Sequence, residues 1–276
     1  MREQKVIADS ELILRPDGSI YHLGITPGFL SDKIITVGDP ERAEWVARYF
    51  DKVENIQRNR EFTCLTGIFQ GEAISVISTG IGTDNIDIVF NEVDALFNID
   101  FERRQLKAHP RSLRFFRLGT SGIVSERLNV GDIAVSTASV GFDSLGQFYQ
   151  IPDFWHGHIN GIPYYQAEAD AKLMGSFDSF LQVKTATMPG FYGPQNRFLR
   201  IKKNKQIAFW QMIDKLELDN LEMETSGIYL MSKLLGHQAI SINALLAHRR
   251  KGIFHPQPEK IIQNMIEKSL PIIAAL

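Results

Sequence analysis

Apolar runs alternate along the chain with stretches whose apolar residues repeat at helical spacing, a pattern typical of α/β proteins. We expect strands near residues 34–37, 61–69, 73–79, 115–118, 130–140, 183–188 and 239–247. We expect helices from residues 40 and 84, near 167–181, 203–216 and 225–235, and from residue 258 onward. No linker or internal repeat interrupts this order. The predicted fold is therefore α/β, a single domain over 1–276 with a large mixed central β-sheet flanked by helices. Residues 1–20 are expected to form a flexible or intersubunit N-terminal arm.

The first predicted strand passes into a helix through residues suited to that junction. Gly38 allows the turn, Asp39 is a favourable N-cap and Pro40 fits the first helical position. Arg42 then lies in the first turn, where a cation opposes the helix dipole. A basic residue at this place fits an anion site at a helix N-terminus, although a solvated arginine is the alternative.

The stretch Phe115–Gly122 is the centre of the predicted site. An apolar strand is expected to end there in two glycines that bracket two hydroxyls. Glycines allow a turn with outward N–H groups, which attracts anions. Arg117, Thr120 and Ser121 supply one fixed charge and two hydroxyl donors for an oxyanion. An ordinary capped turn is the alternative interpretation.

Two later segments add candidate polar groups. Phe191, Gln195 and Arg197 follow a predicted strand, and such residues stack on a planar heterocycle and bind its polar edge. Glu222 and Glu224 flank a methionine just before a predicted helix. Their carboxylates either cap that helix or accept hydrogen bonds from a sugar diol.

Composition narrows the class of protein. A net charge of -2 argues against a general nucleic-acid binder, and the charged segment 100–114 indicates a surface excursion. The single cysteine, Cys64, makes no internal disulfide and is expected in the core, which favours a cytoplasmic location. We find no secretion signal or membrane anchor. The Gly-x-Gly within 78–82 has Asn85 where a dinucleotide fingerprint needs its third glycine, so we reject NAD binding.

Eight short motifs occur in a fixed order from residue 22 to residue 225. They read HLGIT (22–26), GDPER (38–42), REF (60–62), STGIG (78–82), RLGTSG (117–122), NVGD (129–132), FYGPQNR (191–197) and EMET (222–225). Together they resemble the nucleoside phosphorylase family, most closely its uridine phosphorylase branch. The resemblance covers the chain from residue 21 almost to its end. It implies a nucleoside phosphorylase-like fold and the phosphorolysis of a nucleoside to free base and ribose 1-phosphate.

The resemblance also assigns roles by position. It implies phosphate binding by Gly38, Arg42, Arg60, Arg117 and Thr120, and ribose binding by His22, Met223 and Glu224. It implies base binding by Ser121, Gly122, Phe191, Gln195 and Arg197, with Arg117, Glu224 and Arg197 as the catalytic residues. His22 and Arg60 resemble residues lent by the neighbouring subunit of a homodimer, and the sequence leaves open whether such dimers assemble into a hexamer.

The expected substrate is uridine or a related pyrimidine nucleoside. Purine-cleaving relatives carry an aspartate after the late strand, whereas residues 243–251 contain no carboxylate. Phosphate is a co-substrate, and no other cofactor, metal, nucleic-acid or membrane partner is expected. A monovalent interface cation is not predicted, because Asn85 replaces a serine of that site in relatives. The sequence departs from bacterial uridine enzymes at Gly193-Pro194, at His248-Arg249 and in the 100–114 insertion.

Two alternatives remain at this stage. The first is a purine or broad-specificity nucleoside phosphorylase of the same fold. The second is a non-catalytic nucleoside-binding member, which is expected to lack some phosphate arginines or Glu224. All of these residues are present.

Overall fold

The computed structural model describes residues 6–152, 155–202, 204 and 207–276. Its helices are α1 (Pro40–Ala47), α2 (Thr83–Asn98), α3 (Ala171–Ser176), α4 (Phe209–Lys215), α5 (Thr225–Leu235) and α6 (Pro258–Ala275), with a short 3-10 turn at Leu145–Gln147. The first strands are β1 (Lys33–Val37), β2 (Lys52–Asn59), β3 (Phe62–Phe69), β4 (Glu72–Ser78), β5 (Ile99–Asp100), β6 (Gln105–Leu106) and β7 (Arg114–Ile123). The later ones are β8 (Ile133–Gly141), β9 (His156–Ile159), β10 (Ile162–Glu168), β11 (Leu181–Thr187), β12 (Asn220–Glu222), β13 (Gln238–His248) and β14 (Ile253–Phe254).

Twelve of the strands form one mixed sheet that closes on itself in its middle. β7 pairs with both β13 and β12, and β13–β8–β11–β12 completes a ring of five strands. From β7 the sheet continues outward through β1, β4, β3 and β2. β1, β4, β7 and β13 run parallel, so their carboxyl ends meet at one edge. That edge is where α/β folds bind ligands.

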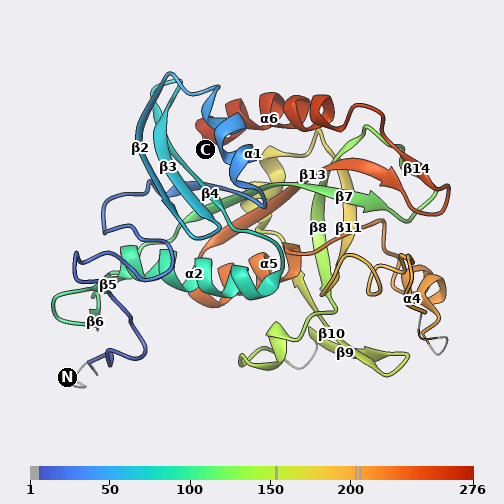
Figure 1. Cartoon of the computed structure of the whole chain (residues 1–276), viewed down its shortest axis with the longest axis horizontal. Coiled ribbons are helices and arrows are strands. Elements are labelled where there is room, and N and C mark those ends of the chain that lie inside the picture. Colours follow the sequence, from blue (N-terminus) through green and yellow to red (C-terminus); the bar gives the residue numbers. More distant parts are fainter. Residues whose placement is uncertain (1–5, 153–154, 203, 205–206) are drawn as a thin grey trace.

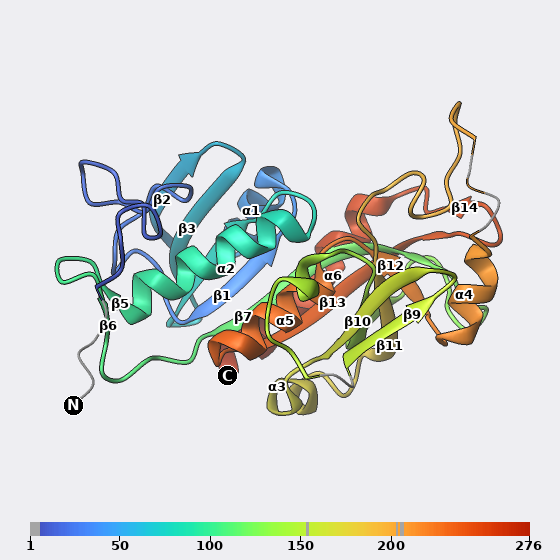
Figure 2. The same ribbon diagram turned by 90° about the horizontal axis from the view of Figure 1, so that it is seen from below.

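Helices cover both faces of the sheet (Figures 1 and 2). α1 and α6 lie on one face and bury Val46 and Ile266 against a core that includes Phe116 of β7. α2 and α5 lie on the other face and bury Phe90 and Ile228 in a second core. The single-domain α/β fold with a large mixed sheet is thus confirmed, and its closure into a barrel was not predicted.

Several predicted elements differ from the structure. The central strand does not end at the glycines, because β7 continues through Gly119 and Gly122 to Ile123. β2 was missed, since its side chains are mostly exposed and polar and give no strand pattern. The helix expected near 167–181 is the short α3, because 162–168 extends the sheet as β10. α4 covers only the end of the helix expected at 203–216, of which residues 203, 205 and 206 lie outside the described residues.

The segment 100–114 is a surface excursion, as expected. β5 and β6 form a small hairpin, and its Arg104 binds the N-terminal segment. The Arg104 guanidinium donates to the carbonyl oxygens of Ile7 at 2.8 Å and Leu12 at 2.6 Å. Leu12 and Ile20 are buried in the core. Residues 7–20 therefore pack on their own chain, and a contact with another subunit stays a prediction.

Candidate active site

A cleft of about 720 Å³ opens at the edge where the parallel strands end. Gly38 follows β1, Gly80 follows β4, and Ala247 lies near the end of β13. The structure brings almost all predicted site residues to this cleft: Gly38, Arg42, Arg117, Thr120, Ser121, Gly122, Phe191, Gln195, Arg197, Met223 and Glu224. His22 and Arg60 do not line it.

One end of the cleft begins at helix α1. The Asp39 carboxylate accepts the Glu41 N–H at 2.9 Å, and Pro40 begins the helix, as predicted. Arg42 in the first turn lines the cleft. Burial lowers the pKa of Arg42, and the nearby charge of Arg117 lowers it further. Two neighbouring cations, the half-buried Arg42 and the buried Arg117, favour an anionic ligand.

Arg117 is anchored from several strands at once. Its Nη2 lies 2.7 Å from Glu224 Oε2 and 2.9 Å from Glu222 Oε2. Its Nη1 donates to Asn243 Oδ1 at 2.9 Å. Burial alone lowers the pKa of Arg117, but Glu222 and Glu224 reverse this effect and the net shift is upward. Arg117 therefore stays charged although it is only 6 % exposed.

Glu222 and Glu224 make different hydrogen bonds. Glu222 Oε2 accepts the N–H groups of Glu224 and Thr225, both at 2.9 Å, at the start of α5. Its Oε1 accepts the Thr187 hydroxyl at 2.6 Å. Glu224 makes no capping bond to α5, and its Oε1 accepts the Gly82 N–H at 2.8 Å. Both glutamates line the cleft and pair with Arg117. Of the two interpretations of this pair, capping applies to Glu222, whereas Glu224 makes no capping bond to α5.

The glycines of β7 serve close packing and not a turn. Gly119 and Gly122 are not among the glycines with positive φ, so the expected anion-binding turn is wrong. A Cβ at position 119 would collide with the Arg117 guanidinium. A Cβ at position 122 would lie 3.3 Å from the side chain of Arg249. Each glycine therefore makes room for an arginine that lies over its strand.

The opposite end of the cleft holds the aromatic, amide and guanidinium groups. The Arg197 guanidinium lies 4.0 Å from the centroid of the Phe191 ring, a cation–π contact. Gln195 is buried at the cleft wall. Arg249 lies close enough to Arg197 that its pKa falls to about 10, through burial first and Arg197 second. Among the described residues, the buried Nη1 of Arg249 has no hydrogen-bond partner.

Sequence reasoning left Arg249 open and gave Asn243 no role. The signal available for Asn243 was its polar side chain at an inward position of a buried strand. Arg249 is brought over Gly122 only because β13 pairs with β7, which the sequence order does not reveal.

His22 and Arg60 form a separate cluster on the surface. His22 Nδ1 lies 2.6 Å from Glu92 Oε1, and Glu92 also accepts the N–H groups of His22 and Leu23. Arg60 has a φ of 53° and lies over the Tyr21 ring at 5.2 Å. Both side chains are therefore held in place outside the cleft of their own chain. Their predicted action in a neighbouring subunit stays a prediction.

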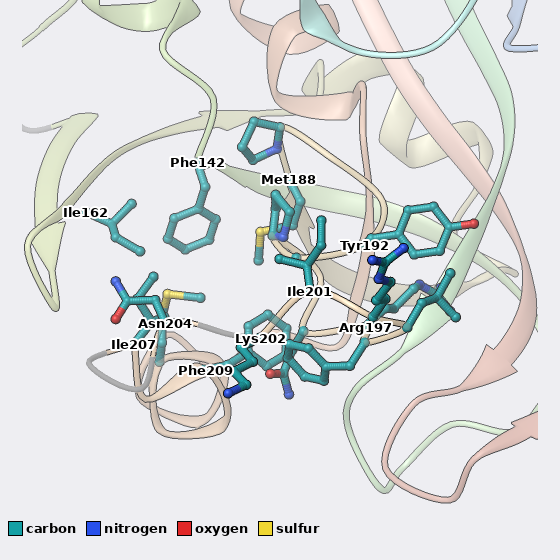
Figure 3. Close-up of a pocket in the computed structure, with 18 residues that line it drawn as sticks. Phe142, Ile162, Met188, Tyr192, Arg197, Ile201, Lys202, Asn204, Ile207 and Phe209 are labelled. Carbon is teal, nitrogen blue, oxygen red and sulfur yellow. The ribbon is translucent and has the colours of Figure 1, made fainter.

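A second cavity of about 930 Å³ adjoins the cleft and is mostly apolar (Figure 3). Met188 and Phe209 belong to its lining. In the segment 191–197, Gln195 faces the cleft and Tyr192 the second cavity, while Arg197 borders both. Segment 191–197 therefore forms the partition between two spaces.

The described residues contain neither a cluster of metal ligands nor an exposed thiol. No group of three His, Cys, Asp or Glu side chains there has the spacing of a metal site. Cys64 is buried in the core as expected, and burial followed by the charge of Glu92 raises its pKa to about 12. Within the same residues, no helix is both long and apolar enough to cross a membrane.

The fold and the cleft define an α/β protein with an anion end and an aromatic–guanidinium end in one site. The sequence signature of the phosphorylase superfamily matches residues 32–273, and the chain belongs to that family. A uridine phosphorylase from Salmonella typhimurium is 33% identical over 239 residues, covering 83% of this chain and 86% of the relative. A purine nucleoside phosphorylase from Buchnera aphidicola is 28% identical over 266 residues, covering 90% and 95%.

A solved structure gives the same result. The Trypanosoma brucei nucleoside phosphorylase, described as showing uridine phosphorylase activity, matches with a TM-score of 0.84 at 27% identity. The match covers 96% of this chain and 99% of the other. The family expected from the eight sequence motifs is thereby confirmed.

Proposed function

We propose that the protein catalyses the phosphorolysis of a pyrimidine nucleoside, most simply uridine plus phosphate to uracil and ribose 1-phosphate. The observation that carries the proposal is the grouping of Arg42 and Arg117 with Glu224, Gln195 and Arg197 in one cleft. Uridine phosphorylases among the relatives support it. The reaction transfers a pentosyl group from the base to phosphate.

In this proposal the half-buried Arg42 and the buried Arg117 hold the phosphate. Arg42 and Arg117 neutralise its charge, and Gly38 and Thr120 contribute an N–H and a hydroxyl at the same end of the cleft. Placing phosphate beneath the anomeric carbon supplies most of the catalysis by proximity. The bound dianion also stabilises the positive charge that develops on the sugar as the glycosidic bond breaks.

Glu224 and the opposite end of the cleft hold the nucleoside. Phosphate binding draws Arg117 away from Glu224, whose carboxylate then accepts hydrogen bonds from the ribose hydroxyls next to Met223. Gln195 and Arg197 bind the pyrimidine carbonyls and ring N–H, while Phe191, Ser121 and Gly122 line the base site. Arg197 stabilises the negative charge of the departing base, so no strong general acid is required.

His22 and Arg60, which lie outside the cleft, are the basis of the proposed subunit assembly. We propose a homodimer in which His22 reaches the ribose and Arg60 the phosphate of the partner's site. Their fixed geometry supports this role, since Glu92 holds His22 and Tyr21 packs on Arg60. A cytoplasmic location is proposed because the single cysteine, Cys64, is buried and makes no disulfide within the chain.

The test is ultraviolet-detected base release from uridine, thymidine and inosine, each with and without phosphate. Phosphate-dependent release from uridine with inosine untouched is the expected result. Inosine cleavage would support the purine phosphorylase alternative, which the Buchnera relative keeps open. Release without phosphate would contradict phosphorolysis, and a protein that binds uridine without releasing uracil would be the non-catalytic member.

A further inference from the structure

Polar side chains form a hydrogen-bonded chain that runs once around the inside of the five-stranded barrel, and we call this chain the polar ring. Each step crosses to the next strand of the closed sheet. Its two ends, Arg117 and Ser121, both lie on β7, so the ring is open at that strand. Its members, in order, are Arg117 (β7), Asn243 (β13), Ser136 (β8), Thr185 (β11), Asn220 (β12) and Ser121 (β7). The four middle residues are fully buried, and the two end residues line the cleft.

The arginine fixes the direction of the first hydrogen bonds. A guanidinium only donates, so Asn243 must turn its amide oxygen toward Arg117, at 2.9 Å. The amide nitrogen of Asn243 then faces Ser136 and donates to Ser136 Oγ at 3.0 Å. Ser136 accepts this bond and is left with its own hydroxyl proton to donate. That proton has Thr185 Oγ1 as its partner at 2.6 Å.

The same direction continues to the other end. Thr185 accepts from Ser136 and donates to Asn220 Oδ1 at 2.8 Å. Asn220 therefore presents its amide nitrogen to Ser121 and donates to Ser121 Oγ at 2.8 Å. Because the Ser121 oxygen accepts from inside the barrel, its own proton is directed elsewhere. The remaining direction is the cleft, which Ser121 lines.

We propose that this ring is a positioning device that sets Ser121 as a hydrogen-bond donor to the nucleoside. Asn220, Thr185, Ser136 and Asn243 are positioning residues that never touch the ligand. A donor fixed in this way matches a carbonyl oxygen of the base and disfavours a ring N–H at the same place. The inference rests on the proposed nucleoside site and adds the source of its hydrogen-bond polarity.

Thr185→Val tests the ring at its point farthest from the cleft. Valine keeps the shape of threonine and removes the hydroxyl, so Ser136 and Asn220 lose their shared partner. Asn220 is then free to turn, and Ser121 loses its fixed donor direction. We expect KM and Kd for uridine to rise about five- to tenfold. KM for phosphate should stay within about twofold, because Glu222 and Glu224 still hold Arg117.

Thr66→Val is the matched control. Thr66 is buried in β3, and its hydroxyl also has two partners, the Phe29 carbonyl at 2.9 Å and Ser75 Oγ at 2.7 Å. The two variants should lose comparable thermal stability, but only Thr185→Val should weaken uridine binding. Ser121→Ala should reproduce the nucleoside effect. Adding Thr185→Val to it should cause no further loss.

Calorimetric measurement of the Kd for uridine without phosphate tests the role of the ring independently of the proposed reaction. Wild-type protein that binds uridine but releases no uracil would contradict phosphorolysis, and the binding comparison would still test the ring. Equal uridine affinity in Thr185→Val and Thr66→Val would overturn the ring's role, as would wild-type protein that binds no nucleoside. If Thr185→Val fails to fold, Ser136→Ala interrupts the same ring one step earlier.

Discussion

Arg117 Nη2 lies 2.7 Å from Glu224 Oε2, so the proposed phosphate ligand and the proposed ribose ligand are paired with each other in the cleft. Glu222 shares the same nitrogen at 2.9 Å. The cation thus compensates two buried carboxylates. In the proposed reaction, phosphate competes with Glu224 for Arg117 and so frees the Glu224 carboxylate for the ribose.

Arg117→Met should damage both stability and activity. It leaves Glu222 and Glu224 buried without their cation, which typically costs about 3–5 kcal/mol. Activity, measured as kcat/KM, should fall by at least about a hundredfold because phosphate loses a charge-assisted partner. Urea unfolding and phosphorolysis assays measure the two effects. Arg58→Met, which removes an exposed partner of Glu44, should change stability by less than about 1 kcal/mol.

Glu222 should influence the pH dependence of activity, because its charge affects the pKa of Glu224. Burial raises the pKa of Glu224, Arg117 opposes the rise and Glu222 adds to it. Because the proposed role needs the carboxylate form, activity should fall as the pH drops through this raised pKa. Glu222→Gln removes a negative charge beside Glu224, so its pKa falls and the acid limb of kcat/KM should move to lower pH. Glu72→Gln, which alters a remote pair with Lys33, should leave the limb in place.

Gly119→Ala should weaken phosphate binding. Its Cβ collides with the Arg117 guanidinium, which is held on several sides and cannot turn away freely. We expect KM for phosphate to rise about tenfold or more, with a smaller change in KM for uridine. Gly175→Ala in α3 is the control, since no atom lies within 4 Å of its added Cβ. A phosphate KM unchanged in Gly119→Ala would contradict the fixed position of Arg117.

Arg249→Met should stabilise the folded protein and weaken its binding of uridine. The pKa of Arg249 lies near 10, below the ordinary value of 12.5, because burial and Arg197 disfavour its charge. A depressed pKa of a base means that the charged form costs stability below pH 10, and the cost is relieved as the pH rises from there. Removing the charge should therefore add about 1 kcal/mol at pH 7. It should also raise KM for uridine, because the Arg249 side chain packs on Gly122 and lies near Arg197, two residues that line the cleft. Thermal melting and steady-state kinetics at the same pH test both effects.

The proposal that Arg60 acts in the cleft of the neighbouring subunit can be tested by subunit exchange. Arg60→Ala and Glu224→Ala chains should each be nearly inactive as homodimers. In a mixed dimer, one site combines an intact cleft with an intact Arg60 from the neighbour, so partial activity should return. Mass spectrometry must verify that the subunits have exchanged. Verified heterodimers without activity would contradict the lending of Arg60 across the interface.

Local signals predicted the elements that begin or end with distinctive residues. The cap Asp39 and the first-turn Pro40 identified α1, and Gly236 ends α5 in the left-handed conformation that a terminal glycine favours. Nearly all of the site residues that motif resemblance assigned line the cleft. These signals need only a few neighbouring residues, which explains their success.

Long-range pairing accounts for most of what sequence reasoning missed. Nothing local indicates that β13 pairs with β7 and closes a barrel, so the contact between Asn243 and Arg117 was not foreseen. The glycines of β7 looked like a turn because their packing partners are not evident from the local sequence: Arg117 folds back over Gly119 on the same strand, and Arg249, just after β13, packs on Gly122. β2 escaped notice because tertiary pairing with β3, and not its own pattern, makes it a strand.

The division between Glu222 and Glu224 bears on how this site can change over evolutionary time. Glu222 anchors the start of α5, whereas Glu224 makes no capping bond to α5 and accepts the Gly82 N–H that precedes α2. A lineage can therefore replace the residue at 224, and with it the preferred sugar, without loosening the start of α5. Position 222 has no such freedom, since one mutation there alters both architecture and charge. Adaptation to new nucleosides should accordingly begin at Glu224 and reach Glu222 late.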